Sequence, residues 1–120
     1  MRRFWHGWLE WAAAAGIDYF VGRTIPPWLD GLWLRDVAGE ANTAWFHGAS
    51  DWARYWTSTI EELAPALLRS TYVTEEMLDG FRKHSRDRHY WTSVISFTAS
   101  WGWKPAGPLP VKSPRLIIPR

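Results

Sequence analysis

Residues 88–101, with the sequence RHYWTSVISFTASW, alternate between two kinds of side chain and predict the clearest strand of the chain. Every second position from His89 onward carries mostly large apolar groups, and the positions between them are mostly small, hydroxylated or β-branched. Aromatic and β-branched residues favour a pleated strand. Both faces of this strand are suited to burial, as in a sheet that is covered on two sides.

A second strand is expected over residues 36–46. Val37, Ala41 and Trp45 lie on one side of it, and Gly39 is a weak point in its middle. The two expected strands are separated by a stretch in which the apolar residues recur with a helical period.

Two helices are expected before these strands, over residues 3–15 and 24–33. The first has apolar residues at spacings of three and four, and Gly16 is suited to end it. The second has Thr24 as a candidate cap, and the two prolines that follow suit a first helical turn.

Two further helices are expected between the strands, over residues 51–69 and 74–85. Ser50 and Thr74 are suitable N-caps, and an acidic first turn follows each of them. The first of these helices has a continuous apolar stripe and contains Pro65, which is expected to kink the helix or end it early.

The composition sets limits on the class of protein. The chain has 120 residues, about the length of one domain, and is 47% hydrophobic and 22% charged, which excludes a disordered acidic protein. It contains no cysteine, which excludes a disulfide scaffold, a thiolate metal site and a cysteine nucleophile. No apolar run reaches the roughly 18 residues of a membrane span, and no signal peptide is recognised. The expected location is therefore the cytoplasm.

The charge is unevenly distributed. Residues 1–87 contain nine basic and twelve acidic residues, whereas residues 88–120 contain five basic residues and no acidic one. Five of the eight prolines lie after Lys104, so residues 104–120 are expected to be a disordered, Pro-rich tail behind a single domain of residues 1–103. Most basic residues of this end lie in that tail and not on a folded face, so no nucleic-acid partner is expected.

Three segments, in this order, carry a resemblance to a known family. They are Gly16-Ile17-Asp18-Tyr19 followed by Val21-Gly22-Arg23 and Ile25-Pro26; Leu32 to Val37 (LWLRDV); and Tyr72-Val73-Thr74-Glu75-Glu76 with Leu78-Asp79, followed by Ala99 to Pro105 (ASWGWKP). Together they resemble the C-terminal portion of the class I S-adenosylmethionine-dependent methyltransferases. The resemblance covers residues 10–105.

The resemblance implies an α/β chain with a partial Rossmann-like methyltransferase fold, made of the last two antiparallel strands plus flanking helices. Residues 36–46 would be strand six, and residues 88–101 would be strand seven, which lies between strands five and six in that family. The family binds its cofactor at a glycine-rich loop after its first strand, and here the nine glycines stand singly. The cofactor-binding half is therefore absent, and S-adenosylmethionine, implied by the family, is not expected to bind this chain alone.

Three positions depart from the family's pattern. Trp33 and Thr71 stand where the family usually has glycine, and Trp103 stands where it usually has arginine. Trp33 puts a large ring at the exit of a helix, where a residue with positive φ is commonly needed. The departures favour a truncated or decaying copy of a methyltransferase gene, and the alternative is a family member that tolerates them.

His47 is a candidate general base, because it follows the expected strand six and an imidazole exchanges protons near neutral pH. The candidates for substrate binding are aromatic residues: Trp45, Trp52, Tyr55 and Trp56. The alternatives are a surface turn for His47 and a packed core for the aromatic stripe. No metal site is expected, since His84 and His89 do not have a recognised ligand spacing, and a solvated, charged turn is expected to contain both.

The sequence thus predicts the substrate-side elements of a small-molecule methyltransferase, which would be inactive alone. A strand seven without its neighbour has an unpaired edge, so we expect either a complementing polypeptide or self-association through that edge. A second hypothesis is a small aromatic-rich protein-interaction module without enzymatic activity. A third places the Trp-rich first helix, beside Arg2 and Arg3, at a membrane surface.

Overall fold

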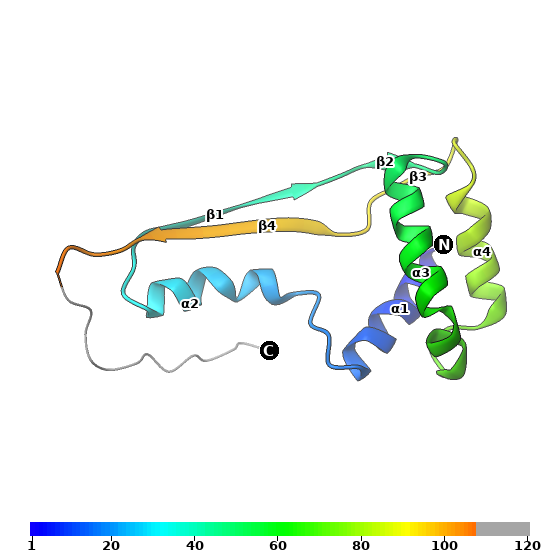
Figure 1. Cartoon of the computed structure of the whole chain (residues 1–120), viewed down its shortest axis with the longest axis horizontal. Helices are drawn as coiled ribbons and strands as arrows, with labels where there is room; N and C mark the ends of the chain where they lie inside the picture. The colour runs from blue at the N-terminus through cyan, green and yellow to red at the C-terminus, as the bar shows by residue number, and fades with distance from the viewer. Residues whose placement is uncertain (108–120) are drawn as a thin grey trace. The chain divides into compact units, whose positions relative to one another are not determined.

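Over residues 1–107 the chain is mixed α/β and contains two small antiparallel sheets of two strands each (Figure 1). The computed structural model describes residues 1–107, so that residues 108–120 of the expected tail lie outside the described residues. The chain divides into two compact units. We call Met1–Asp18 together with Ala44–Val94 the helical unit, and Tyr19–Thr43 together with the described residues from Ile95 onward the sheet unit.

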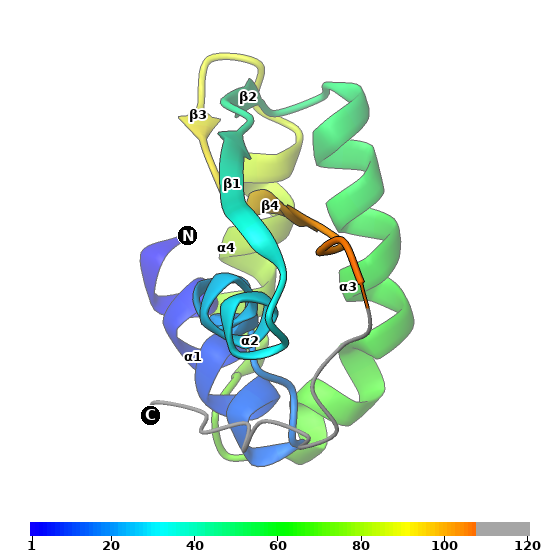
Figure 2. The same ribbon diagram turned by 90° about the vertical axis from the view of Figure 1, so that its left-hand side faces the viewer.

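The helical unit contains α1 (Arg2–Ala14), α3 (Asp51–Arg69) and α4 (Glu75–Ser85), which are seen together in Figure 2. Helix α4 contacts both α1 and α3. A short antiparallel pair of β2 (Phe46–His47) and β3 (Trp91–Thr92) completes the unit. The apolar periodicity of the sequence predicted these helices to within one residue at each end.

The apolar core lies in the helical unit. Its buried residues are Phe4, Trp8, Ala12, Phe46, Ala53, Trp56, Ile60, Ala64, Leu67, Val73, Leu78 and Phe81. Phe4 of α1 stacks on Phe81 of α4 with ring centroids 4.7 Å apart. Trp5 meets Trp56 of α3 edge to face at 5.4 Å. Aromatic contacts thus join all three helices of this unit.

The helix ends of this unit follow the expected capping chemistry. Ser50 Oγ accepts the N–H of Ala53 at 3.2 Å, and Thr74 Oγ1 accepts the N–H of Met77 at 3.3 Å. Just beyond α1, Gly16 has a φ of 84°, which a residue without a Cβ adopts at little cost. The predicted caps and the predicted stop of the first helix are confirmed.

Pro65 does not end α3 early, contrary to one of the two expected effects, and the helix continues to Arg69. Proline lacks a backbone N–H, so the carbonyl of Glu61 loses its helical partner. Glu61 and Pro65 are both exposed, where water can satisfy that carbonyl. Leu67, in the turn after the proline, is fully buried and packs this end of the helix into the core.

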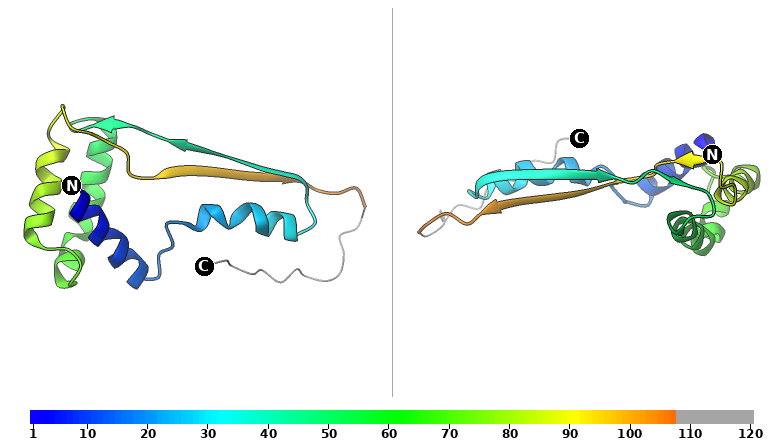
Figure 3. Two further views of the ribbon diagram at one scale, coloured as in Figure 1. Left: turned by 180° about the vertical axis from the view of Figure 1, so that it is seen from behind. Right: turned by 90° about the horizontal axis from the view of Figure 1, so that it is seen from above.

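The sheet unit is built on one pair of strands (Figure 3). β1 (Arg35–Thr43) pairs antiparallel with β4 (Ser96–Trp103), and Glu40 lies opposite Ala99. The two segments predicted as strands therefore pair with each other in the expected antiparallel sense.

The helices of the sheet unit, η1 (Val21–Arg23) and α2 (Ile25–Gly31), contact one face of this sheet. A Cβ added to Gly22 of η1 would meet the side chain of Thr98. A Cβ added to Gly102 would likewise meet the side chain of Leu34, which lies in the segment that joins α2 to β1. Because side chains alternate along a strand, the even-numbered positions of β4 face the helices.

The opposite face of β4, formed by its odd-numbered positions, carries exposed aromatic residues. Phe97, Trp101 and Trp103 are 51%, 44% and 64% exposed. Among the described residues of the sheet unit, Thr24 alone is buried. Its hydroxyl donates to the Val21 carbonyl at 2.7 Å and does not cap α2, contrary to expectation. The sheet unit is thus without a buried apolar residue in its described part.

Each predicted strand is interrupted once. The strand expected over residues 36–46 is divided into β1 and β2 at Ala44 and Trp45. The strand expected over residues 88–101 begins only at Trp91, is interrupted over residues 93–95 and ends at Trp103. Both interruptions fall where the chain passes between the two units. The alternation of residue types continues across them, so the sequence pattern does not reveal the break.

Two residues of the sheet unit other than glycine have a positive φ, a backbone conformation that favours glycine. Trp33, directly after α2, has a φ of 66°, and Asp36 has a φ of 51° at an irregularity of the β1–β4 register. The helix exit at Trp33 therefore does need the positive φ that the sequence predicted. A β-branched or aromatic side chain is strained there, because its Cβ crowds the backbone.

Candidate functional site

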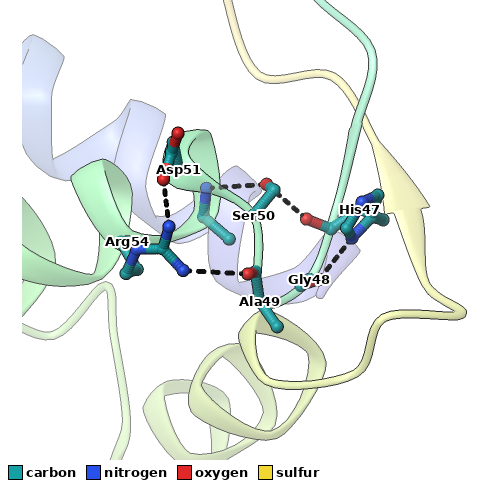
Figure 4. A network of polar contacts seen from close by, with 7 residues as sticks. His47, Gly48, Ala49, Ser50, Asp51 and Arg54 are labelled. Carbon is teal, nitrogen blue, oxygen red and sulfur yellow. Dashed lines mark hydrogen bonds and ion pairs between the residues drawn. The ribbon is translucent and has the colours of Figure 1, made fainter.

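His47 ends β2, and the turn after it leads into α3 (Figure 4). Ser50 Oγ, which caps α3, also donates to the His47 carbonyl at 2.6 Å. Arg54 donates to the carbonyl of Ala49 at 3.0 Å and forms an ion pair with Asp51. These bonds are local and fix the course of the turn, so they position His47 relative to the start of α3.

The turn also packs against the segment that joins α4 to β3. The N–H of Gly48 donates to the Tyr90 carbonyl at 3.0 Å, and the N–H of Ala49 donates to the Ser85 carbonyl at 2.8 Å. A Cβ on Gly48 would meet the carbonyl oxygen of Asp87, which is backbone and cannot easily move. A side chain at position 48 would separate the two segments, so glycine is required here for close approach.

The hydrogen bond of His47 fixes its tautomer. Nδ1 lies 2.6 Å from the Gly48 carbonyl oxygen, which only accepts, so Nδ1 carries the proton and Nε2 of the neutral ring is left as an acceptor. The ring also meets Trp91 edge to face at 5.1 Å. An unprotonated Nε2 could accept a proton, as a general base must, but His47 does not line the cavity described below.

The candidate substrate-binding residues divide between surface and core. Trp52 and Tyr55 meet edge to face at 5.8 Å, and Tyr55 meets Trp56 in the same way at 5.4 Å. Trp56 is buried against Trp5, which makes it a core residue. Tyr55 is 55% exposed and Trp45 is 68% exposed. The structure thus brings three of the four candidates into one aromatic row and leaves Trp45 largely in solvent.

A small cavity lies behind this row, within the helical unit. Trp5, Phe46, Trp56, His84 and Tyr90 are among the residues that line it. It offers no more room than a single water molecule needs, so it cannot hold a methyl acceptor or a nucleotide-type cofactor. The buried Nε1–H of Trp5 has no acceptor among the described residues.

His84 was assigned to a solvated turn by the sequence, together with His89. It is instead half-buried: its Nδ1 lies 2.8 Å from the Gly80 carbonyl oxygen, and its ring meets Tyr90 at 4.3 Å. His89 is exposed. Within residues 1–107, no group of three His, Asp or Glu side chains is placed to hold a metal ion.

The last turn of α4 contains the basic residues Arg82, Lys83 and His84. Arg82 forms an ion pair with α3 that the sequence did not reveal. Arg82 donates to both carboxylate oxygens of Glu61 on α3, at 2.6 and 2.9 Å, and to Asp79 at 3.1 Å. The hydrogen bond from Arg82 lowers the pKa of Glu61, against a smaller opposing effect of burial. The same pair raises the pKa of Arg82. Arg82 is therefore a link between α3 and α4.

No family model matches the chain, and comparison with curated proteins and with solved structures finds no match either. Over the part of the chain that the structure describes, no helix combines the length and the apolar character that crossing a membrane requires.

Proposed function

We propose that this chain is the C-terminal portion of a class I S-adenosylmethionine-dependent methyltransferase of small-molecule type and is inactive alone. The observation that carries the proposal is the antiparallel pairing of β1 with β4, with Glu40 opposite Ala99. The resemblance implies this pairing for strands six and seven of that family. Two of the segments that carry the resemblance overlap these strands: Leu32 to Val37 runs into the start of β1, and Ala99 to Pro105 contains the end of β4.

The positive φ of Trp33 also supports the proposal. The family usually has glycine at this position, and glycine is the residue that the observed backbone favours. A large aromatic residue in a glycine conformation is what relaxed selection on an ancestral glycine would leave behind. The backbone of the sheet unit thus keeps a feature that its own sequence no longer favours.

The described residues do not fit the family's cofactor. No glycine-rich loop follows a strand, and the cavity of the helical unit is too small for a nucleoside. We therefore derive no methyl-transfer step through this chain. Methyl transfer would need a complementing polypeptide that supplies the cofactor half, and the chain would contribute its last strands and substrate-side helices.

The eleven indole N–H groups test the proposal in ¹H–¹⁵N correlation spectra of the full chain. Addition of S-adenosylhomocysteine alone should move none of them, and a saturable shift would show a cofactor site and overturn the proposal. Addition of a methyltransferase polypeptide that ends after its fifth strand should shift the indoles of the sheet unit, Trp28, Trp33, Trp101 and Trp103. With both additions present, the ligand should then bind, and failure of the sheet-unit indoles to respond would count against the proposal.

The exposed aromatic face of β4 favours a second candidate function, that of a protein-interaction module without enzymatic activity. Exposed Phe, Trp and Tyr side chains are enriched where proteins meet. The same spectra separate the two candidates, because an interaction module would not need a methyltransferase half to order its sheet-unit indoles.

A further inference from the structure

We infer that β4 pairs with β4 of a second copy of this chain, in antiparallel register with Ala99 on the two-fold axis. The inference concerns the strand edge alone and does not rest on descent from a methyltransferase. It would give a continuous sheet in the order β1-β4-β4-β1, with both copies of α2 on the same face.

The first step is that β4 has an available edge. Among residues 1–107, β4 pairs with β1 only, so the N–H and C=O groups on its other edge have no strand partner. A two-stranded sheet is marginally stable in isolation, and a row of unpaired backbone groups is a template for pairing with another chain.

The second step is that charge distinguishes the two edges of the sheet. β1 carries Arg35, Asp36 and Glu40, which oppose edge-to-edge association. From Trp91 to Trp103 the chain has no charged residue and no proline. The β4 edge therefore has none of the features that normally prevent strand addition. Another uncharged strand edge, such as β4 of a second copy, can pair with it without charge repulsion.

The third step is that β4 is complementary to itself in one register. With Ala99 opposite Ala99 of the second copy, Phe97 lies opposite Trp101 on the open face, and by symmetry this aromatic pair occurs twice. On the other face, Thr98 lies opposite Ser100. Aromatic pairs and hydroxyl pairs directly across two strands are the ones that stabilise a sheet. The exposed rings of Phe97 and Trp101 would thereby gain a cross-strand neighbour and become less exposed.

Sedimentation velocity of the full chain over a range of concentrations tests the inference, with Ala99→Lys as the disrupting variant. Ala99 is exposed and lies opposite Glu40 within one copy, so a lysine there gains an ion-pair partner and the monomer fold is kept. In the dimer, the two lysines would lie opposite each other, and the dissociation constant should rise about tenfold or more. Ala38→Lys is the matched control, since Ala38 is an exposed residue of β1 in the same sheet.

A cysteine substitution tests the register. The chain has no cysteine, so Ala99→Cys gives a single thiol, and Ala99 on the axis brings the two Cα atoms to a distance that a disulfide spans. Mild oxidation should cross-link this variant and leave Ala38→Cys monomeric on a denaturing gel. A monomer of the unmodified chain at all concentrations, equal weakening by both lysine variants, or cross-linking of Ala38→Cys in place of Ala99→Cys would each overturn the inference.

Discussion

The helical unit and the sheet unit use the same aromatic-rich composition in opposite ways. In the helical unit, Phe4, Trp56 and Phe81 are buried and their ring contacts join three helices. In the sheet unit, Trp33, Trp101 and Trp103 are exposed. The comparison shows that a high aromatic content does not by itself indicate a core. A high aromatic content indicates apolar surface that is stabilised by burial, and only the helical unit buries its aromatic side chains against its own residues.

The difference follows from geometry. Three helices can enclose apolar side chains between them, because each presents one apolar stripe to the others. A pair of strands with helices on one face leaves its second face open, and the apolar area that it buries does not offset the entropy of ordering the chain. The sheet unit therefore requires further contacts. The proposed methyltransferase half would supply another surface, and the proposed second copy would supply backbone pairing and side-chain contacts along the edge of β4.

Truncation of a buried ring should have the largest effect and would sharpen this comparison. Phe81→Ala removes a ring that is 1% exposed and stacked on Phe4, and we expect it to lower the free energy of unfolding by about 3–5 kcal/mol. The matched variant Phe97→Ala, in the sheet unit, should cost less than about 1 kcal/mol at a concentration where the chain is monomeric, because its ring is half exposed there. Urea denaturation followed by far-ultraviolet circular dichroism measures both. Equal losses would mean that the sheet unit has a core of its own.

Replacement of the strained tryptophan should have a smaller effect of the opposite sign. Trp33→Gly relieves a positive φ that costs about 1–2 kcal/mol in an L-residue, partly offset by the greater freedom of glycine in the unfolded chain. We expect a net gain of about 0.5–1 kcal/mol, measured as slower hydrogen exchange of the β1 and β4 amides. Trp101→Gly, the same substitution inside a strand, should accelerate exchange. A loss of protection in Trp33→Gly would show that the Trp33 ring stabilises the unit more than its backbone strains it.

The sequence was sufficient for the parts of the fold that depend on local patterns. The caps at Ser50 and Thr74 and the stop at Gly16 each follow from one residue and its neighbours. The interruption over residues 93–95 does not, because it depends on which strand pairs with which, and pairing is a non-local property.

The candidate site shows the same limit. The exposed Tyr55 and the buried Trp56 are adjacent in one aromatic stripe, and their different environments are set by the helix that packs on one side of α3. His47 was identified from its place after a strand, but its hydrogen bond to Gly48 depends on a turn whose course Ser50 and Ser85 fix. The Glu61–Arg82 pair joins residues 21 positions apart, and no spacing rule in a single sequence predicts it.

That ion pair gives the smallest effect and tests how far the helical unit depends on polar contacts. The pKa of Glu61 is lowered from its usual 4.5, so the pair stabilises the folded state above that pH, and the contribution is lost as the pH falls through the folded value. Both side chains are partly exposed, at 42% and 31%, so solvent screening limits the contribution to about 0.2–1 kcal/mol. Glu61→Gln should remove this part of the acid dependence of the unfolding free energy. Arg82→Gln should remove it together with the contribution of the Arg82–Asp79 pair, and the double variant should remove no more than Arg82→Gln alone. Thermal unfolding between neutral pH and pH 3 measures the three variants. Additive losses would mean that the two side chains act independently, and that the packing of α3 on α4 rests on the apolar core alone.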